Sequence, residues 1–341
     1  MRRQVLEAGP FDFEAGGHLD NIRIVYHTSD REYKAGDKVV WICHALTANS
    51  DVSDWWPQLV GPGQFVDPDK FFVVCVSMIA SPYGECSPAA IDPKTGKPYL
   101  FDFPMTTVRD MVSAEIMVRK ALGIEHIDLL LGCSIGGFQA VEWAVTEPDI
   151  FGKALFFATS PRVSPWLSAG VEAQRMALEA DPTFREAKSL EGGREGLKCS
   201  RAQALISYRC FEGYALRQSE PDEDVLFAGR AASYERHQGL KITQRGFDAY
   251  SYWYLCFALD SHNVGRHRGG VASALARIKA KTTVIAIDSD GLFPLSEMKA
   301  MAQMIPGADM RIITSSFGLD GFLLEYPQLT EILAPIIHDI K

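Results

Sequence analysis

The sequence predicts an α/β protein with a mostly parallel sheet that is interrupted by a large helical insertion. Short apolar runs of strand-like composition alternate with helical patterns toward both ends of the chain. Near-continuous apolar strands of this kind are typical of a parallel sheet that is buried on both faces. Residues 161–261 show helical patterns without strands. We therefore expect a core formed by residues 1–160 and 262–341, and a helical lid formed by residues 161–261.

The expected elements follow one another in a regular order. Three strand-like runs come first, and then an amphipathic helix over about 107–122, whose apolar residues keep the three- and four-residue spacing of one helix face. The lid has helical segments near 171–179, 201–208 and 247–259, and a last helix is expected after Pro327. The predicted strands are 22–26, 39–43, 71–76, 127–131, 154–158, 283–287 and 310–313.

Size and charge exclude several classes of protein. A chain of 341 residues is long enough for one large or two ordinary domains, and its 47% hydrophobic and 23% charged residues are typical of a soluble globular enzyme. The net charge of −9 argues against nucleic acid as a partner, because nucleic acid favours a basic face. No apolar run approaches the roughly 20 residues of a membrane-spanning helix, so no membrane partner is expected.

The cysteines and the amino terminus predict a cytoplasmic protein. The seven cysteines include no Cys-x-x-Cys pair, and several lie in or beside apolar runs. This is typical of reduced core thiols. The amino terminus lacks the apolar stretch of a secretory signal. Because the sequence has neither zinc-ligand spacing nor a phosphate-binding or dinucleotide fingerprint, we expect no metal and no bound cofactor.

The stretch 127–137 carries the most specific chemical signal. An apolar strand-like run leads through Gly132, Ser134 and Gly136 into a helical pattern. Glycines two residues before and after the serine let the backbone turn sharply without Cβ clashes. In this context the pattern is the Gly-x-Ser-x-Gly nucleophile elbow, which exposes a serine hydroxyl and leaves helix N–H groups near an oxyanion. Ser134 is therefore the candidate nucleophile, and an ordinary glycine-rich turn is the alternative.

The candidate acid follows the predicted strand 283–287. In this architecture the nucleophile is followed along the chain by an acid and then by a histidine, on loops after successive late strands. The strand ends in Asp288 and Asp290. Either carboxylate suits an imidazole partner, and we favour Asp290 because it lies further out on the loop. The alternative is a solvated or helix-capping carboxylate.

The histidine that is expected after the last strand is absent. Segment 315–323 contains none. His44 follows a strand at a place where a histidine usually shapes an oxyanion loop, whereas His262 and His267 lie where the lid returns to the sheet. His338 is on the terminal helix, and none of the four lies on this loop. A serine hydroxyl without a base is a poor nucleophile, although oxyanion stabilisation and substrate binding can persist.

Specific motifs recur along nearly the whole chain, at 43–50, 54–56, 59–63, 102–104, 109–111, 132–137, 207–209, 261–266, 288–294 and 320–325. Together they resemble the homoserine O-acetyltransferase family, whose members have the α/β-hydrolase fold. The resemblance implies transfer of an acetyl group from acetyl-CoA to the hydroxyl of homoserine through an acyl-serine, in methionine biosynthesis. Acyl-CoA is then a co-substrate rather than a bound cofactor. The resemblance also implies a homodimer formed through the helical lid.

The same resemblance implies roles for single residues. Ser134 corresponds to the nucleophile and Asp290 to the acid of the triad. The backbone N–H groups of Leu46 and Ile135 correspond to the oxyanion hole. At the position of the family's triad histidine this chain has Leu319, so that the general base is missing by direct alignment.

Two further residues are implied to bind the amino-acid substrate. Arg209 corresponds to the fork that holds the carboxylate, for which the planar guanidinium is well suited. Asp320 corresponds to the partner of the substrate ammonium. The alternative for Arg209 is a salt bridge within the lid. The stretch 77–88 departs from the family, and its new carboxylate at Glu85 is expected near the approach to the serine.

Three hypotheses follow from these observations. The first is an acyltransferase that acts on homoserine or a related hydroxy-amino acid. The second is a catalytically impaired homologue, a pseudoenzyme that keeps the amino-acid pocket. The third is a diverged serine hydrolase that uses another base. Arg209 and Asp320 favour the first two, and Leu319 favours the second over the first. The acyl donor, acetyl or succinyl, stays open.

Overall fold

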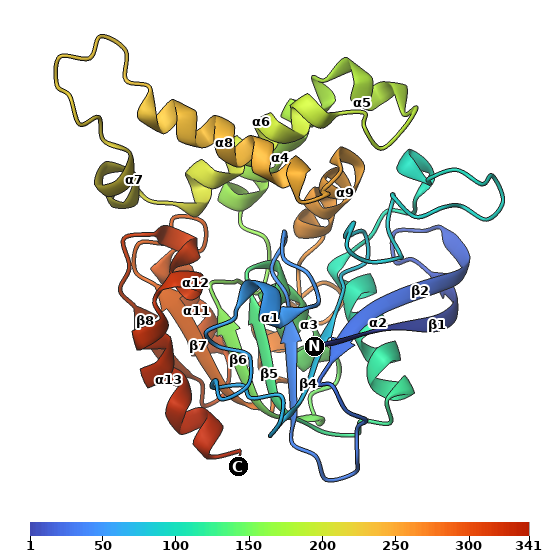
Figure 1. Cartoon of the computed structure of the whole chain (residues 1–341). Helices are drawn as coiled ribbons and strands as arrows, with labels where there is room; N and C mark the ends of the chain where they lie inside the picture. Colours follow the sequence, from blue (N-terminus) through green and yellow to red (C-terminus); the bar gives the residue numbers. More distant parts are fainter. Residues whose placement is uncertain (341) are drawn as a thin grey trace.

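A computed structural model describes residues 1–340, which contain one eight-stranded sheet (Figure 1). Its strands lie in the order β1-β2-β4-β3-β5-β6-β7-β8. From β4 to β8 in this order, neighbouring strands are parallel. Strand β1 is antiparallel to β2, and β2 is antiparallel to β4. The predicted α/β fold with a mostly parallel sheet is therefore confirmed. The strands are β1 (Arg2–Asp12), β2 (His18–Thr28), β3 (Val39–Cys43), β4 (Phe72–Val76), β5 (Ile127–Cys133), β6 (Phe151–Phe157), β7 (Lys281–Ile287) and β8 (Asp309–Ile313).

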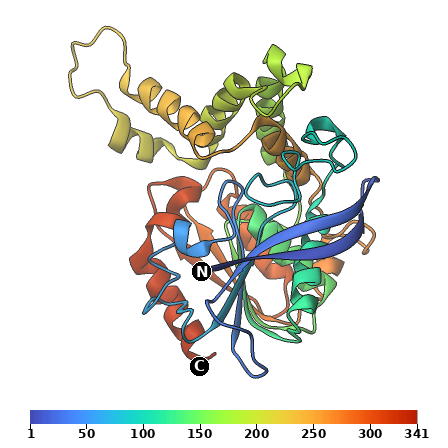
Figure 2. The same ribbon diagram turned by 45° about the vertical axis from the view of Figure 1, so that its right-hand side comes forward.

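The hairpin of β1 and β2 was only partly predicted. Strand β1 was not expected, and β2 was expected only over 22–26. Strand β1 lies at the edge of the sheet, and most of its residues are exposed or half-buried. It therefore lacks the buried apolar run that marks an inner strand. Figure 2 shows the hairpin projecting from the sheet.

Helices cover both faces of the inner strands, since every residue of β3 and β4 is buried. Helix α2 (Val108–Ala121) agrees with the helix expected over 107–122, and begins with a capping box between Thr107 and Asp110. The other helical elements of the core are α1 (Val52–Trp55), η1 (Leu100–Asp102), α3 (Ile135–Thr146), α10 (Val271–Leu275), α11 (Leu295–Met304), η2 (Gly318–Asp320), α12 (Gly321–Leu324) and α13 (Tyr326–His338).

The lid consists of the helices between β6 and β7. In Figures 1 and 2 they form a separate layer above the sheet, and the loop that joins α7 to α8 projects far from the core. The sequence indicated three of these helices but gave no signal for α5, α7 or α8. The lid helices are α4 (Pro165–Glu179), α5 (Pro182–Glu186), α6 (Arg194–Tyr208), α7 (Phe211–Gln218), α8 (Arg230–Gln244) and α9 (Ala249–Asp260).

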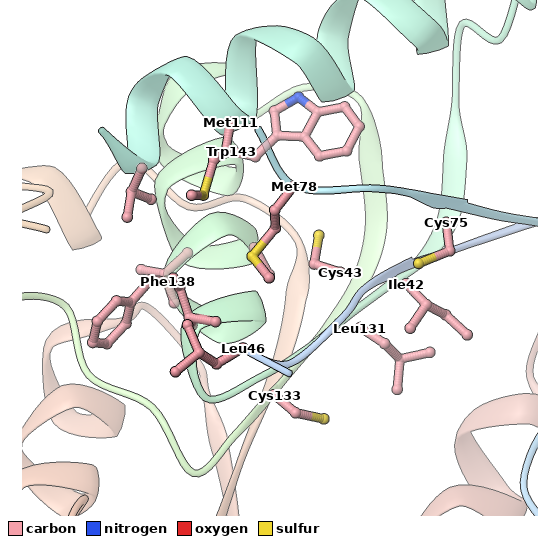
Figure 3. Packing of buried hydrophobic residues seen from close by; sticks show 14 of the residues in the cluster. Ile42, Cys43, Leu46, Cys75, Met78, Met111, Leu131, Cys133, Phe138 and Trp143 are labelled. Atoms are coloured by element: carbon pink, nitrogen blue, oxygen red, sulfur yellow. The ribbon is translucent and has the colours of Figure 1, made fainter. Parts of the chain in front are cut away.

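A buried carboxyl group lies in the core between α2 and the sheet. Trp41 of β3 packs edge-to-face on Trp143 of α3, with ring centroids 5.1 Å apart. Its indole Nε1 donates to Oε2 of Glu115 at 2.7 Å. Burial raises the pKa of Glu115 to about 8, so this carboxyl is largely neutral at pH 7. Figure 3 shows the surrounding core, with Cys43 on β3 and Trp143 nearby.

The cysteines are unpaired, as the sequence predicted. All seven are free, and five of them are buried. No helix among residues 1–340 is long and apolar enough to cross a membrane.

Candidate active site

The turn between β5 and α3 forces Ser134 into a strained conformation. Its backbone angles are φ 56° and ψ −123°, which a residue with a Cβ rarely adopts. The flanking glycines make the turn possible. A Cβ on Gly136 would lie 2.1 Å from the carbonyl oxygen of Cys43, and one on Gly132 would lie 2.3 Å from that of Gly136. The strand–turn–helix context required for a nucleophile elbow is therefore present.

Ser134 lies at the floor of a small cavity between the sheet and the lid. From the lid, α4 supplies Leu167 and Val171, which lie four residues apart on one face of the helix. The end of α6 supplies Tyr208. The sequence analysis did not single out the α4 residues, although their i, i+4 spacing was visible. The full lining is Leu46, Ser134, Leu167, Gly170, Val171, Gln174, Ser207, Tyr208, Leu259, Leu292 and Phe293.

Of the two residues predicted to stabilise an oxyanion, Leu46 lines this cavity and Ile135 directly follows Ser134. Ile135 is the first residue of α3, where an N–H has no partner within the helix. Leu46 lies just after β3 and lines the cavity together with Ser134. The close packing of Gly136 against the end of β3 holds these two segments together.

Asp290 is buried on the loop after β7, and half of its carboxylate has no partner. Its Oδ1 accepts the backbone N–H groups of Leu292 at 2.8 Å and Phe293 at 3.0 Å. Its Oδ2 is buried without a hydrogen bond among residues 1–340. The pKa of Asp290 is raised to about 7. Burial is the main cause and the nearby carboxylate of Asp320 adds to it, whereas the N–H groups of Phe293 and Leu292 lower the pKa. Asp288, the other candidate acid, has a different partner. Its Oδ1 accepts the backbone N–H of Ser315 at 3.1 Å.

Leu319 lies on the neighbouring loop after β8. This loop is tied to the acid loop because the backbone N–H of Gly318 donates to Ser289 Oγ at 3.1 Å. Gly318 also touches the lid, since a Cβ there would lie 2.6 Å from the carbonyl oxygen of Tyr208. The Leu319 side chain is 4% exposed, so an apolar group fills this part of the interior.

Arg209 and Asp320 meet between the lid and the core. A guanidinium nitrogen of Arg209 lies 3.0 Å from Asp320 Oδ2, and both side chains are about four-fifths buried. Burial raises the pKa of Asp320, although the guanidinium groups of Arg209 and then Arg201 lower it. The two residues that the sequence proposed for opposite ends of a zwitterion are therefore adjacent, and in this structure each neutralises the other.

Two buried histidines lie near the site, and one ring nitrogen of His262 contacts the carbonyl oxygen of Ser160 at 2.9 Å while its Nδ1 has no partner among residues 1–340. His44 donates from Nδ1 to its neighbouring carbonyl at Ala45 (3.0 Å), and its Nε2 accepts the N–H of Met78 at 3.1 Å. Burial lowers the pKa of His44 to about 4. His262 stacks on the ring of Phe138 at 4.0 Å, and burial lowers its pKa to about 3. Both histidines have structural positions in the described chain.

Glu85 lies away from the serine, contrary to the expectation from the sequence. Its carboxylate pairs with Arg3 at 2.6 Å and with Arg23, both on the β1–β2 hairpin. These partners belong to strands that the sequence predicted incompletely, so Glu85 could not be placed in advance. The start of the same stretch does reach the site indirectly, because Met78 binds His44 behind the oxyanion loop.

Comparison with known proteins agrees with this geometry. The α/β hydrolase fold family matches residues 38–317. A homoserine O-acetyltransferase of Cyclobacterium marinum is 39% identical over 322 residues, covering 94% of this chain and 90% of the relative. This chain belongs to the homoserine O-acetyltransferase family.

Solved structures show the same fold. The crystal structure of homoserine O-acetyltransferase from Staphylococcus aureus has a TM-score of 0.81 at 29% identity, covering all of this chain and 95% of the other. The crystal structure of esterase E22 has a TM-score of 0.88 at 21% identity, covering 98% and 99%. At that identity the second likeness shows the fold alone.

Proposed function

We propose that this protein binds a homoserine-like amino acid and an acyl-CoA in the manner of its family, and that it transfers the acyl group slowly because Ser134 lacks a histidine base. The observation that carries the slow step is the unpartnered Oδ2 of Asp290. A buried carboxylate oxygen without a donor costs roughly 1–3 kcal/mol, or more when charged. Its position on the acid loop is where an imidazole N–H would bind, and the neighbouring loop offers Leu319 instead.

The chemistry assigned to the site is a double displacement. Ser134 Oγ attacks the thioester carbonyl, the C–S bond breaks, and the CoA sulfur takes a proton. The amino-acid hydroxyl then attacks the acyl-serine and releases the O-acyl product together with the free serine. The N–H groups of Leu46 and Ile135 stabilise the oxyanion in both steps. Each step also needs a group that accepts a proton and returns it, and leucine does neither.

The amino-acid acceptor is assigned to Arg209 and Asp320. A zwitterion carries a carboxylate for the guanidinium and an ammonium for the carboxylate. Because these side chains now pair with each other at 3.0 Å, substrate binding exchanges one internal ion pair for two external ones. Both groups are largely buried, so the new contacts are charge-assisted hydrogen bonds of about 1.5–3 kcal/mol each, offset by loss of the internal pair.

A homodimer through the lid is part of this proposal. Large apolar side chains are strongly exposed on α6, α7 and the segment that joins α7 to α8. This part of the lid projects from the core in Figures 1 and 2. A second copy that buries this surface removes it from water. The residues are Ile206 (62% exposed), Phe211 (81%), Leu216 (67%), Leu226 (84%) and Phe227 (82%). We also keep the cytoplasmic location as a proposal, on the basis of the seven unpaired cysteines.

Serine ester hydrolysis is the second candidate. It is favoured by the elbow itself, which positions a serine hydroxyl for attack on an ester. Hydrolysis needs only water as the second nucleophile, so Arg209 and Asp320 would have no role in it. Hydrolysis of simple esters by the parent protein, without acyl transfer to homoserine, would favour this candidate.

One experiment tests the main proposal. The purified protein is incubated with acetyl-CoA, with and without homoserine, while free CoA and the mass of the intact protein are followed. We expect slow acetylation of Ser134 that is absent in Ser134→Ala, and calorimetric binding of homoserine. Turnover near the roughly 10 s⁻¹ of a typical enzyme would refute the missing base. Absence of homoserine binding would refute the amino-acid pocket.

A further inference from the structure

A threonine from outside the elbow binds the peptide group that follows Ser134. The hydroxyl of Thr159 donates to the backbone carbonyl oxygen of Ser134 at 3.0 Å. Thr159 lies two residues after β6, where the chain leaves the sheet for the lid, and it is fully buried. The first turn of α3 packs directly on it, since a Cβ on Gly137 would lie 2.4 Å from Thr159 Cβ. The sequence analysis did not single out this residue.

The same peptide group carries one of the donors assigned to the oxyanion. The carbonyl of Ser134 and the N–H of Ile135 belong to one planar peptide unit, so a contact that fixes the direction of the carbonyl also fixes the direction of the N–H. Within the helix this carbonyl also accepts the N–H of Phe138 at 3.1 Å. Hydrogen bonds in a chain polarise one another, so a donor at the carbonyl makes the N–H of the same unit a stronger donor.

The end of β6 binds both backbone groups of Ser134. The N–H of Ser134 donates to the carbonyl oxygens of Phe157 at 3.1 Å and Ala158 at 3.2 Å, and its carbonyl accepts from Thr159. Ser134 has the strained angles φ 56° and ψ −123°. A residue keeps such a conformation only when its surroundings fix it from several sides. The Thr159 hydroxyl is the side-chain contribution to this fixation.

Thr159 is itself held in place from two directions. Its backbone N–H donates to the sulfur of Met298 on α11 at 3.4 Å. Just beyond it, the two chain segments that join the lid to the core bind each other, since the N–H of Val163 donates to the carbonyl oxygen of His262 at 2.9 Å. The threonine therefore lies between the elbow and the base of the lid, on a segment whose backbone is fixed.

We propose that Thr159 is a positioning residue for the acylation of Ser134. Its hydroxyl orients the Ser134–Ile135 peptide unit so that the Ile135 N–H points at the oxyanion, and it touches neither the substrate nor the reacting atoms. Loss of one neutral hydrogen bond of this kind slows the step by about 3- to 10-fold. Because the bond acts on the transition state, the half-saturating concentration of the acyl donor stays unchanged. This inference rests on the proposed function, because it assumes that Ser134 is acylated.

The experiment compares the acylation rates of variants with and without the hydroxyl. Thr159→Val and Thr159→Ala remove it, whereas Thr159→Ser keeps it. The control is Thr282→Val, at the opposite end of the sheet. Thr282 is 1% exposed, and its hydroxyl also donates to a backbone carbonyl, that of Ala280 at 3.0 Å.

Two acyl donors are used, acetyl-CoA and p-nitrophenyl acetate. With the second donor, Ser134 Oγ bonds to the acyl carbon, the ester C–O bond breaks, nitrophenolate leaves, and the serine proton passes to water. Intact-protein mass gives the rate of Ser134 acetylation at several donor concentrations, and thermal unfolding of each variant is followed in parallel.

We expect Thr159→Val and Thr159→Ala to lower the maximal acylation rate by about 3- to 10-fold at unchanged half-saturating concentrations. Thr159→Ser and Thr282→Val should stay within about twofold of the parent. Unchanged rates in Thr159→Val would overturn the inference, and so would an equal loss in Thr159→Ser or in the control. If only the variants without the hydroxyl fail to fold, Thr159 is a structural residue and the inference is also overturned.

The two donors separate this inference from the proposed function. If p-nitrophenyl acetate acetylates Ser134 but acetyl-CoA does not, the proposed acyl transfer from CoA fails, and the ester alone decides the role of Thr159. If neither donor acetylates Ser134 of the parent protein, Ser134 is not a nucleophile, and both proposals are overturned.

Discussion

Leu319→His is the most informative single substitution, and its effect on stability follows from two opposing contributions. The leucine side chain is 4% exposed, and burying a side chain of this size stabilises the fold by about 1.5–3 kcal/mol. An imidazole N–H that donates to the free Oδ2 of Asp290 contributes about 1.5–3 kcal/mol, because the acceptor is a carboxylate. The two contributions nearly cancel, so we expect the melting temperature to change by less than about 5 °C.

The effect on the rate is expected to be much larger. With histidine at 319, the site has a nucleophile, an acid, oxyanion donors and a base. A positioned general base accelerates such a step by about 10²- to 10⁴-fold, which corresponds to about 3–5 kcal/mol of activation free energy. The new hydrogen bond also lowers the pKa of Asp290 from about 7, so that its carboxylate is ionised and supports the imidazole. Stopped-flow release of CoA and intact-protein mass measure the acylation rate directly.

Two matched variants show whether the gain comes from the base. Leu319→Asn places a hydrogen-bond donor beside Asp290 but has no basic nitrogen, so it should match the parent rate. Leu319→His combined with Ser134→Ala should lose the gain completely. If Leu319→His folds and shows no acceleration, then Leu319 does not occupy the position of the base. If the double variant keeps the acceleration, a nucleophile other than Ser134 attacks the thioester.

Three further outcomes are expected. Arg209→Ala should weaken homoserine binding by about 10- to 100-fold in calorimetry, since it removes the proposed carboxylate fork, and an unchanged affinity would contradict that role. Glu115→Gln should flatten the pH dependence of stability. The folded-state pKa of Glu115, about 8, lies above the ordinary 4.5. The neutral carboxyl therefore contributes fully to the free energy of unfolding below pH 4.5, and this contribution is lost as the pH rises through 8. Urea unfolding at pH 5 and 9 measures the loss. Gly136→Ala should destabilise the fold by about 4 kcal/mol or more, since its Cβ would lie 2.1 Å from the carbonyl oxygen of Cys43, whereas Gly170→Ala, with open space around it, should be neutral or stabilising.

Much of the fold could be predicted because its inner strands are buried on both faces. The runs at β3, β4 and β5 are almost wholly apolar, and such runs are visible without a structure. Strand β1 could not be predicted in this way. It lies at an edge, and its pairing with β2 depends on contacts between residues 2–28 that leave no apolar run in the sequence.

The candidate site divides in the same way. The elbow at Ser134 and the acid at Asp290 follow from local patterns, because a tight turn needs its glycines and an acid loop follows its strand. The pairing of Arg209 with Asp320 joins residues more than a hundred positions apart, so no local pattern contains it. The placement of Glu85 against Arg3 was missed for the same reason.

The sequence by itself determined the parallel sheet, the helical insertion, the nucleophile elbow and the absence of a histidine after the last strand. Each of these depends on residues that are neighbours along the chain, or on composition that any reader can count. Only the tertiary structure decided that Asp290 keeps one oxygen without a donor and that Arg209 pairs with Asp320. Burial and pairing depend on which distant segments pack together, and that packing sets both the charge balance of the site and the proton acceptors within its reach.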